Sequence, residues 1–110
     1  MRFGLTKKDL ESIVHLLQSK PEIDKAVLFG SRAKGNFKRG SDVDIAIFGE
    51  QVNLEIVSRL SWELNELTSL PYMFDIVDYT HLPHPELKEH IDRVGILLFS
   101  RDNAPEQRKN

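Results

Sequence analysis

Cysteine is absent from the 110 residues of this chain, and long apolar runs and a strong excess of charge are missing as well. The absence of cysteine excludes a disulfide scaffold, a cysteine-based zinc site and a thiol nucleophile. No stretch approaches the ~20 apolar residues of a membrane span, and the charges within the first ten residues argue against a secretory signal. The formal net charge of −2 is unlike that of most domains that hold nucleic acid through their overall field. We therefore expect a cytoplasmic protein without a membrane segment, in which any contact with nucleic acid would depend on a local basic patch.

The composition that remains is typical of a folded domain. Hydrophobic residues make up 40% of the chain and charged residues 29%, and the length is that of one ordinary domain. No repeat or linker divides the sequence. We predict a single domain over residues 1–110, with a polar tail from about residue 101.

Hydrophobic periodicity predicts helices and strands in the order αββαβαβ. The expected helices cover residues 6–20, 54–67 and 85–94, and the expected strands cover residues 25–29, 42–48, 72–79 and 96–99. The short gap between the first two strands favours an antiparallel pair over a full crossover. This pattern predicts an α/β (α+β) fold, with helices packed against a small mixed β-sheet of about four strands.

Two aspartates stand where the second expected strand begins. Asp42 and Asp44 are two residues apart, so their carboxylates point from the same face of a strand. Adjacent carboxylates repel each other, and Mg²⁺ removes that penalty because it prefers hard oxygen ligands. A lone pair of this kind could also be a turn cap at Asp42 and a solvated residue at Asp44, but the motif upstream favours the metal site.

A third carboxylate is available on the strand expected at 72–79. Asp75 lies between Phe74 and Ile76 in an otherwise apolar run, where a charged residue needs a partner. Asp78 is the alternative, and it would face the opposite side of a regular strand. Because Asp78 lies near the end of the run, we expect it to be a turn or edge residue and Asp75 to be the third ligand.

The upstream motif supplies groups that suit a phosphate chain. Gly30 and Ser31 end the first strand, where backbone N–H groups and a hydroxyl can hold phosphate oxygens. The ten residues that follow contain four basic residues and no acidic one, and Arg32 and Lys34 lie nearest Ser31. Alternatively, Ser31 could be a helix N-cap and the basic loop a solvated surface.

These features together resemble the polymerase-β-type nucleotidyltransferases. Gly-Ser, ten residues, Asp-x-Asp and a further aspartate on a later strand carry the likeness, which covers roughly residues 24–80. The segments LFGSRAKG and SDVDIAI are similar to those of the minimal nucleotidyltransferases (MNT), which often work beside a separate helical HEPN protein.

The resemblance implies that Asp42, Asp44 and Asp75 hold two Mg²⁺ ions and that Gly30 and Ser31 hold the triphosphate of ATP. It also implies transfer of AMP to a macromolecular acceptor, a HEPN toxin partner modified at a tyrosine. The chain would accordingly belong to a homodimer or a hetero-oligomer. The alternatives are an antitoxin that neutralises its partner by binding alone, and a subunit of a small-molecule or RNA nucleotidyltransferase. The sequence does not fix the base of the nucleotide or the number of AMP units transferred.

Overall fold

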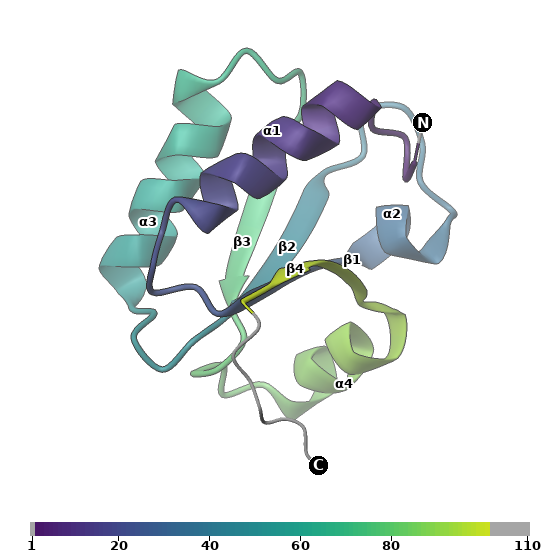
Figure 1. Cartoon of the computed structure of the whole chain (residues 1–110). Helices are drawn as coiled ribbons and strands as arrows, with labels where there is room; N and C mark the ends of the chain where they lie inside the picture. The colour runs from purple at the N-terminus through teal and green to yellow at the C-terminus, as the bar shows by residue number, and fades with distance from the viewer. Residues whose placement is uncertain (1, 102–110) are drawn as a thin grey trace.

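A four-stranded sheet with helices on both faces forms the body of the molecule, as seen in a computed structural model that describes residues 2–101 (Figure 1). The strand order is β3-β2-β1-β4. The elements are α1 (Lys7–Gln18), β1 (Lys25–Phe29), α2 (Gly30–Lys34), β2 (Val43–Phe48), α3 (Leu54–Trp62), the π-helical turn η1 (Glu63–Leu67), β3 (Phe74–Asp78), α4 (Pro85–Val94) and β4 (Ile96–Ser100). Within residues 2–101, no helix combines the length and the apolar character that crossing a membrane would need.

The sheet is mixed, as the sequence predicts. β1 pairs antiparallel with both β2 and β4, whereas β2 and β3 are parallel. Parallel neighbours need a crossover connection, and α3 with η1 provides it. Since β1 ends where β2 and β3 begin, three chain segments meet at one edge of the sheet.

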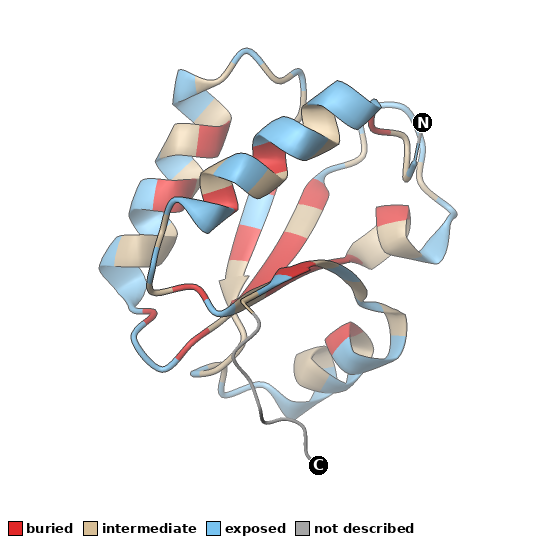
Figure 2. Ribbon diagram, in the orientation of Figure 1, coloured by how far each residue is buried: buried red, intermediate tan, exposed pale blue. Residues whose placement is uncertain are grey.

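The two faces of β2 differ in what covers them. Val43, Ile45 and Ile47 are fully buried in the larger core, which α1 and α3 complete from one side. Ala46 and Phe48 belong to a smaller cluster on the other face, under α4. Figure 2 shows the buried residues along the sheet and on the inward sides of the helices. The alternation expected for residues 42–48 is therefore confirmed.

Several predicted boundaries shift in the structure. The helix expected over 54–67 changes to π-helical geometry at Glu63, and the strand expected over 72–79 is shortened to Phe74–Asp78. The polar tail was expected from residue 101, but Arg101 is anchored: it donates to the carbonyls of Ile23 (2.8 Å) and of Gln18 and Lys20 (both 2.9 Å). The rest of the expected tail lies outside the described residues.

The π-helical turn holds the edge strand β3 through one side chain. Asn65 accepts a hydrogen bond from the Phe74 N–H (2.8 Å) and donates one from Nδ2 to the Phe74 carbonyl (3.1 Å). The amide thus acts like one residue of a neighbouring strand, and it fixes the backbone immediately before Asp75. Extra residues of π geometry are often found at functional positions in helices.

Replacing this amide should loosen β3. We expect Asn65→Ala to lower the free energy of unfolding by about 1–2 kcal/mol, because both backbone groups of Phe74 lose their partner. Urea titration measures the change, and Asn36→Ala in the exposed loop is the control, expected to change stability by less than about 0.5 kcal/mol. Equal effects of the two substitutions would contradict the bridging role of Asn65.

Candidate functional site

The predicted carboxylates gather at the edge of the sheet where β1 ends and β2 and β3 begin. Asp44 is paired with Asp75 in the parallel register of β2 and β3, and with Phe29 in the antiparallel register of β1 and β2. Residues opposite each other in a ladder point to the same face, so Asp44 and Asp75 lie side by side. Asp42 lies two residues before Asp44 along the chain, and its charge acts on Asp44 as the charge of Asp75 does.

Gly30 adjoins this cluster so closely that a side chain there would force the Asp44 carboxylate to move. It follows Phe29 with φ +76°, a left-handed conformation that favours glycine. A Cβ atom built on Gly30 would lie 2.1 Å from Oδ2 of Asp44. The absence of a side chain at Gly30 therefore leaves room for the Asp44 carboxylate. The sequence suggested a different reason for this glycine, the close approach of a ligand to the backbone.

The cluster is electrostatically unfavourable without a cation. Burial, followed by the charges of Asp75 and Asp42, raises the pKa of Asp44 from 3.8 to about 6, while Arg32 acts in the opposite direction. Part of this cost comes from the repulsion between carboxylates that the fold holds together. A group of this kind, perturbed by burial and by specific like charges, is typical of functional sites.

The donor set fits a hard divalent cation. The available ligands are carboxylate oxygens, which Mg²⁺ prefers, and Mg²⁺ in such sites commonly takes one or two carboxylates together with substrate phosphates. Within residues 2–101, no group of three or more His, Cys, Asp or Glu side chains is arranged so that it could hold a metal ion by itself. The residues present are suited to an ion that is shared with a nucleotide rather than enclosed by protein.

The two aspartates of β3 have different surroundings. Asp75 is exposed, although the sequence suggested a core-like position, because β3 is an edge strand. Asp78 accepts a hydrogen bond from the His81 N–H (3.2 Å), and its carboxylate lies 2.9 Å from Nδ1 of His81. Asp78 thus closes the turn after β3, as expected, and Asp75 stays on the face of Asp44.

The basic loop divides into two parts. Ser31, Arg32 and Lys34 lie in α2, a short helix that follows β1 directly. The N-cap position of α2 belongs to Phe29, so the alternative of Ser31 as the N-cap does not apply. Ser31 is half-buried and Lys34 is exposed.

Arg32 differs from the expectation that it would contact the nucleotide. Its side chain is buried, with 3% of its surface exposed. Its guanidinium donates to the carbonyls of Ser41 and Phe3. The donors that a triphosphate would use are thus directed at the chain's own backbone.

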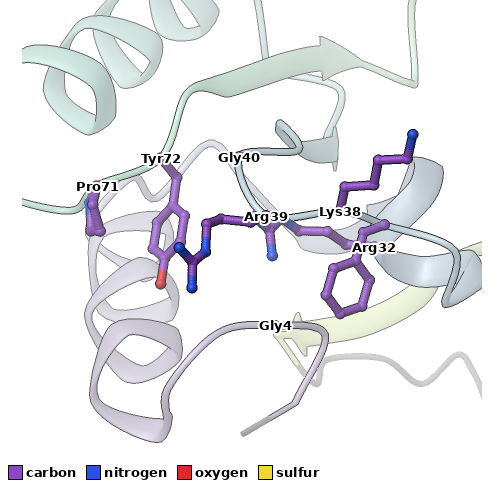
Figure 3. Close-up of a pocket in the computed structure, with 8 residues that line it drawn as sticks. Gly4, Arg32, Lys38, Arg39, Gly40, Pro71 and Tyr72 are labelled. Carbon is purple, nitrogen blue, oxygen red and sulfur yellow. The ribbon is translucent and has the colours of Figure 1, made fainter.

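A pocket of about 470 Å³ lies beside Arg32 (Figure 3). It is bounded by Gly4 of the N-terminal turn, by the loop and by the segment that leads into β3. The lining residues are Gly4, Arg32, Phe37, Lys38, Arg39, Gly40, Pro71 and Tyr72. The loop cations Lys38 and Arg39 therefore line a pocket that does not include the three carboxylates.

Sequence reasoning missed Asn65 as a residue that supports the site. The available signal was an asparagine inside an expected helix, where this residue type is disfavoured unless its side chain has a local partner. Its partner, Phe74, is brought next to it only by the crossover from α3 to β3.

Comparison with known proteins identifies a family that this chain matches. The family model described as Polymerase beta, Nucleotidyltransferase, matches residues 11–104. "Putative protein adenylyltransferase MJ0435" of Methanocaldococcus jannaschii is 39% identical over 70 residues, which cover 63% of this chain and 72% of that protein.

Solved structures agree with the fold. A chain in the crystal structure of a toxin–antitoxin with AMP-PNP superposes with a TM-score of 0.72 at 26% identity, covering 84% of this chain and 73% of that one. A chain from the complex of a tri-AMPylated Shewanella oneidensis HEPN toxin with its MNT antitoxin gives a TM-score of 0.64 at 22% identity, covering 83% and 69%. The predicted nucleotidyltransferase-like fold is therefore confirmed.

The contact between Gly30 and Asp44 can be tested by a double-mutant cycle. Gly30→Ala should destabilise the protein by more than Gly35→Ala, because both glycines have positive φ but only the Cβ at Gly30 meets a carboxylate. We expect about 1 kcal/mol for Gly35→Ala and about 2–3 kcal/mol for Gly30→Ala. Combining Gly30→Ala with Asp44→Ala should recover much of the difference in urea titrations. Additive effects would show that the two residues do not crowd each other.

The repulsion at Asp44 should appear as a pH dependence of stability without metal. The folded state keeps the Asp44 proton up to pH of about 6, whereas the unfolded chain releases it near 3.8, so stability falls as the pH rises through this window. This rise in the pKa of Asp44 corresponds to a loss of about 3 kcal/mol in the free energy of unfolding. Solvent screening at a half-exposed carboxylate reduces the expected loss to about 1 kcal/mol.

Asp44→Asn should remove that loss. In EDTA at pH 7 we expect its melting temperature to exceed that of the wild type by roughly 4 °C, with no difference at pH 4. Asp24→Asn, at an exposed carboxylate outside the cluster, is the control and should show no such gain. An equal melting temperature for Asp44→Asn and wild type at pH 7 would contradict the repulsion.

Proposed function

This chain belongs to the polymerase beta nucleotidyltransferase family, and from that premise we propose that it transfers AMP from Mg-ATP to a hydroxyl group of a HEPN-domain partner protein. The observation that carries the proposal is the placement of Asp44 between Asp75 and the Gly30 turn. The name of the M. jannaschii relative supports a protein acceptor. The toxin–antitoxin neighbour solved with AMP-PNP supports a toxin partner and an adenine nucleotide.

Each part of the site has a task in this reaction. Asp42, Asp44 and Asp75 would hold the metal ions, and Gly30, Ser31 and Lys34 would hold the triphosphate. Bound Mg²⁺ would neutralise the phosphate charge and favour attack at the α-phosphorus. The acceptor oxygen forms a bond to the α-phosphorus while the bond to the α–β bridging oxygen breaks and pyrophosphate leaves. Asp75, exposed on the edge strand, is the carboxylate placed to orient the acceptor hydroxyl and to take its proton.

The openness of the site explains the need for a macromolecular acceptor. Asp42 and Asp75 are exposed. Catalysis of phosphoryl and nucleotidyl transfer depends mainly on positioning and charge neutralisation. A partner that docks over this edge would exclude water and present its hydroxyl.

The three carboxylates can be tested with α-labelled ATP, Mg²⁺ and the purified HEPN partner. Wild type should label the partner, and mass spectrometry should find one or more added AMP units. The Asp42→Asn/Asp44→Asn variant should lose at least 10³-fold in rate, because the metal-binding carboxylates are removed. Asp75→Asn should lose about 10²-fold or more, in line with removal of a general base.

Asp78→Asn is the matched control, since this aspartate lies three residues away on the same strand but is bonded to His81. It should retain transfer within about threefold. If wild type binds the partner and blocks its toxicity without label, and the double variant does so equally, the protein neutralises by binding alone. Label on RNA instead of protein would assign a different acceptor.

A further inference from the structure

Arg32 is the one charged or polar side chain that is buried among residues 2–101. Burial of a guanidinium is costly unless its donors are satisfied. Nη1 donates to the Phe3 carbonyl (2.9 Å), while Nη2 and Nε donate to the Ser41 carbonyl (2.8 and 3.2 Å). The planar group also lies over the rings of Phe37 (5.3 Å) and Tyr72 (5.2 Å). Arg32 therefore connects four segments that meet at the site edge of the sheet.

The residue that receives two of these bonds precedes a proposed metal ligand. Ser41 is followed directly by Asp42, and its own turn is closed by hydrogen bonds with Lys38: Lys38 N–H donates to Ser41 Oγ (2.8 Å), and Ser41 N–H to the Lys38 carbonyl (3.0 Å). Asp42 lies one residue before β2, outside the hydrogen-bonded ladder. Its backbone position therefore depends on the Ser41 carbonyl more than on the sheet.

The N-terminal turn packs tightly against Arg32 and Phe37. Gly4 has φ +77°, and a Cβ there would lie 2.5 Å from Nη1 of Arg32 and 2.5 Å from the Phe37 ring. Phe3 has φ 58°, which is uncommon outside glycine. In this conformation the Phe3 carbonyl accepts a hydrogen bond from the Arg32 guanidinium. Gly4 and Arg32 both line the neighbouring pocket (Figure 3).

We propose that Arg32 is a positioning residue that sets the Asp42 carboxylate for metal binding by holding the Ser41 carbonyl against the N-terminal turn. The proposal rests on the proposed function, because Asp42 acts there as a metal ligand. Lysine at this position keeps the charge but has a single donor group, so it does not bridge two carbonyls in one plane.

The chain offers a matched control. Arg101 also makes three hydrogen bonds to backbone carbonyls, those of Ile23, Gln18 and Lys20, and also lies over an aromatic ring, that of Phe99. It joins β4 to the end of α1, away from the carboxylates. A lysine at either position removes a comparable set of backbone contacts, so the two variants separate loss of stability from loss of positioning.

The test compares Arg32→Lys with Arg101→Lys in the full chain. Mn²⁺ binding without nucleotide, followed by electron paramagnetic resonance, is the readout independent of activity. We expect a loss of about tenfold or more in Mn²⁺ affinity for Arg32→Lys, in line with residues that orient metal ligands, and less than twofold for Arg101→Lys. In AMP transfer, Arg32→Lys should lower kcat by at least tenfold with KM for ATP within twofold of wild type.

Equal Mn²⁺ affinities of the two lysine variants would overturn the proposal. A raised KM for ATP with unchanged kcat in Arg32→Lys would overturn it too, because it would assign Arg32 to direct contact with the nucleotide. If Arg32→Lys does not fold, Gly4→Ala decides, since it crowds Nη1 without changing Arg32; it should weaken Mn²⁺ binding where Gly35→Ala does not. A wild type that binds Mn²⁺ but transfers no AMP would remove the proposed function and leave the affinity comparison valid. A wild type that binds no Mn²⁺ would overturn both.

Discussion

The parallel pairing of β2 with β3 places the Asp44 carboxylate beside that of Asp75, and the rest of the site depends on this repulsive contact. Burial and the neighbouring charges raise the pKa of Asp44 to about 6, so the fold holds a group in a form that is unfavourable without a cation. The large core formed by β2, α1 and α3 supplies the stability that offsets this cost. Such a cluster on a rigid sheet is suited to binding a cation, because a cation would offset a repulsion that is already present.

Side chains that bond to the backbone hold the segments that the sheet does not. Asn65 bridges the two polar groups of Phe74 before Asp75, and Arg32 holds the carbonyl of Ser41 before Asp42. Asp75 lies on an edge strand and Asp42 lies before β2, whereas Asp44 is paired with strands on both sides, so the ladder gives the first two less support. Outside the site, Arg101 joins β4 to the end of α1 in the same manner. The recurring feature is a polar side chain that forms hydrogen bonds with the backbone of a segment distant in the sequence.

The two faces of the sheet differ in the helices that cover them. One face of the sheet is covered by α1 and α3, and α4 packs on the smaller cluster of the other face. Asp75 stays exposed on the edge strand. In the proposed reaction, the acceptor protein completes the site that this chain leaves open, so specificity for the acceptor would come from docking as well as from chemistry.

The local pattern of the sequence was sufficient for the element order, the mixed sheet and the two faces of β2, because periodicity of apolar residues reports directly on burial. It also singled out Gly30, Asp42, Asp44 and Asp75, since their spacing has few other chemical uses. It did not reveal that Gly30 makes room for Asp44, that Asn65 bonds to Phe74, or that Arg32 is buried. Each of these depends on contacts between segments 9 to 29 residues apart along the chain. Only the tertiary structure decides them, because burial of a polar group is determined by the partners that folding brings to it.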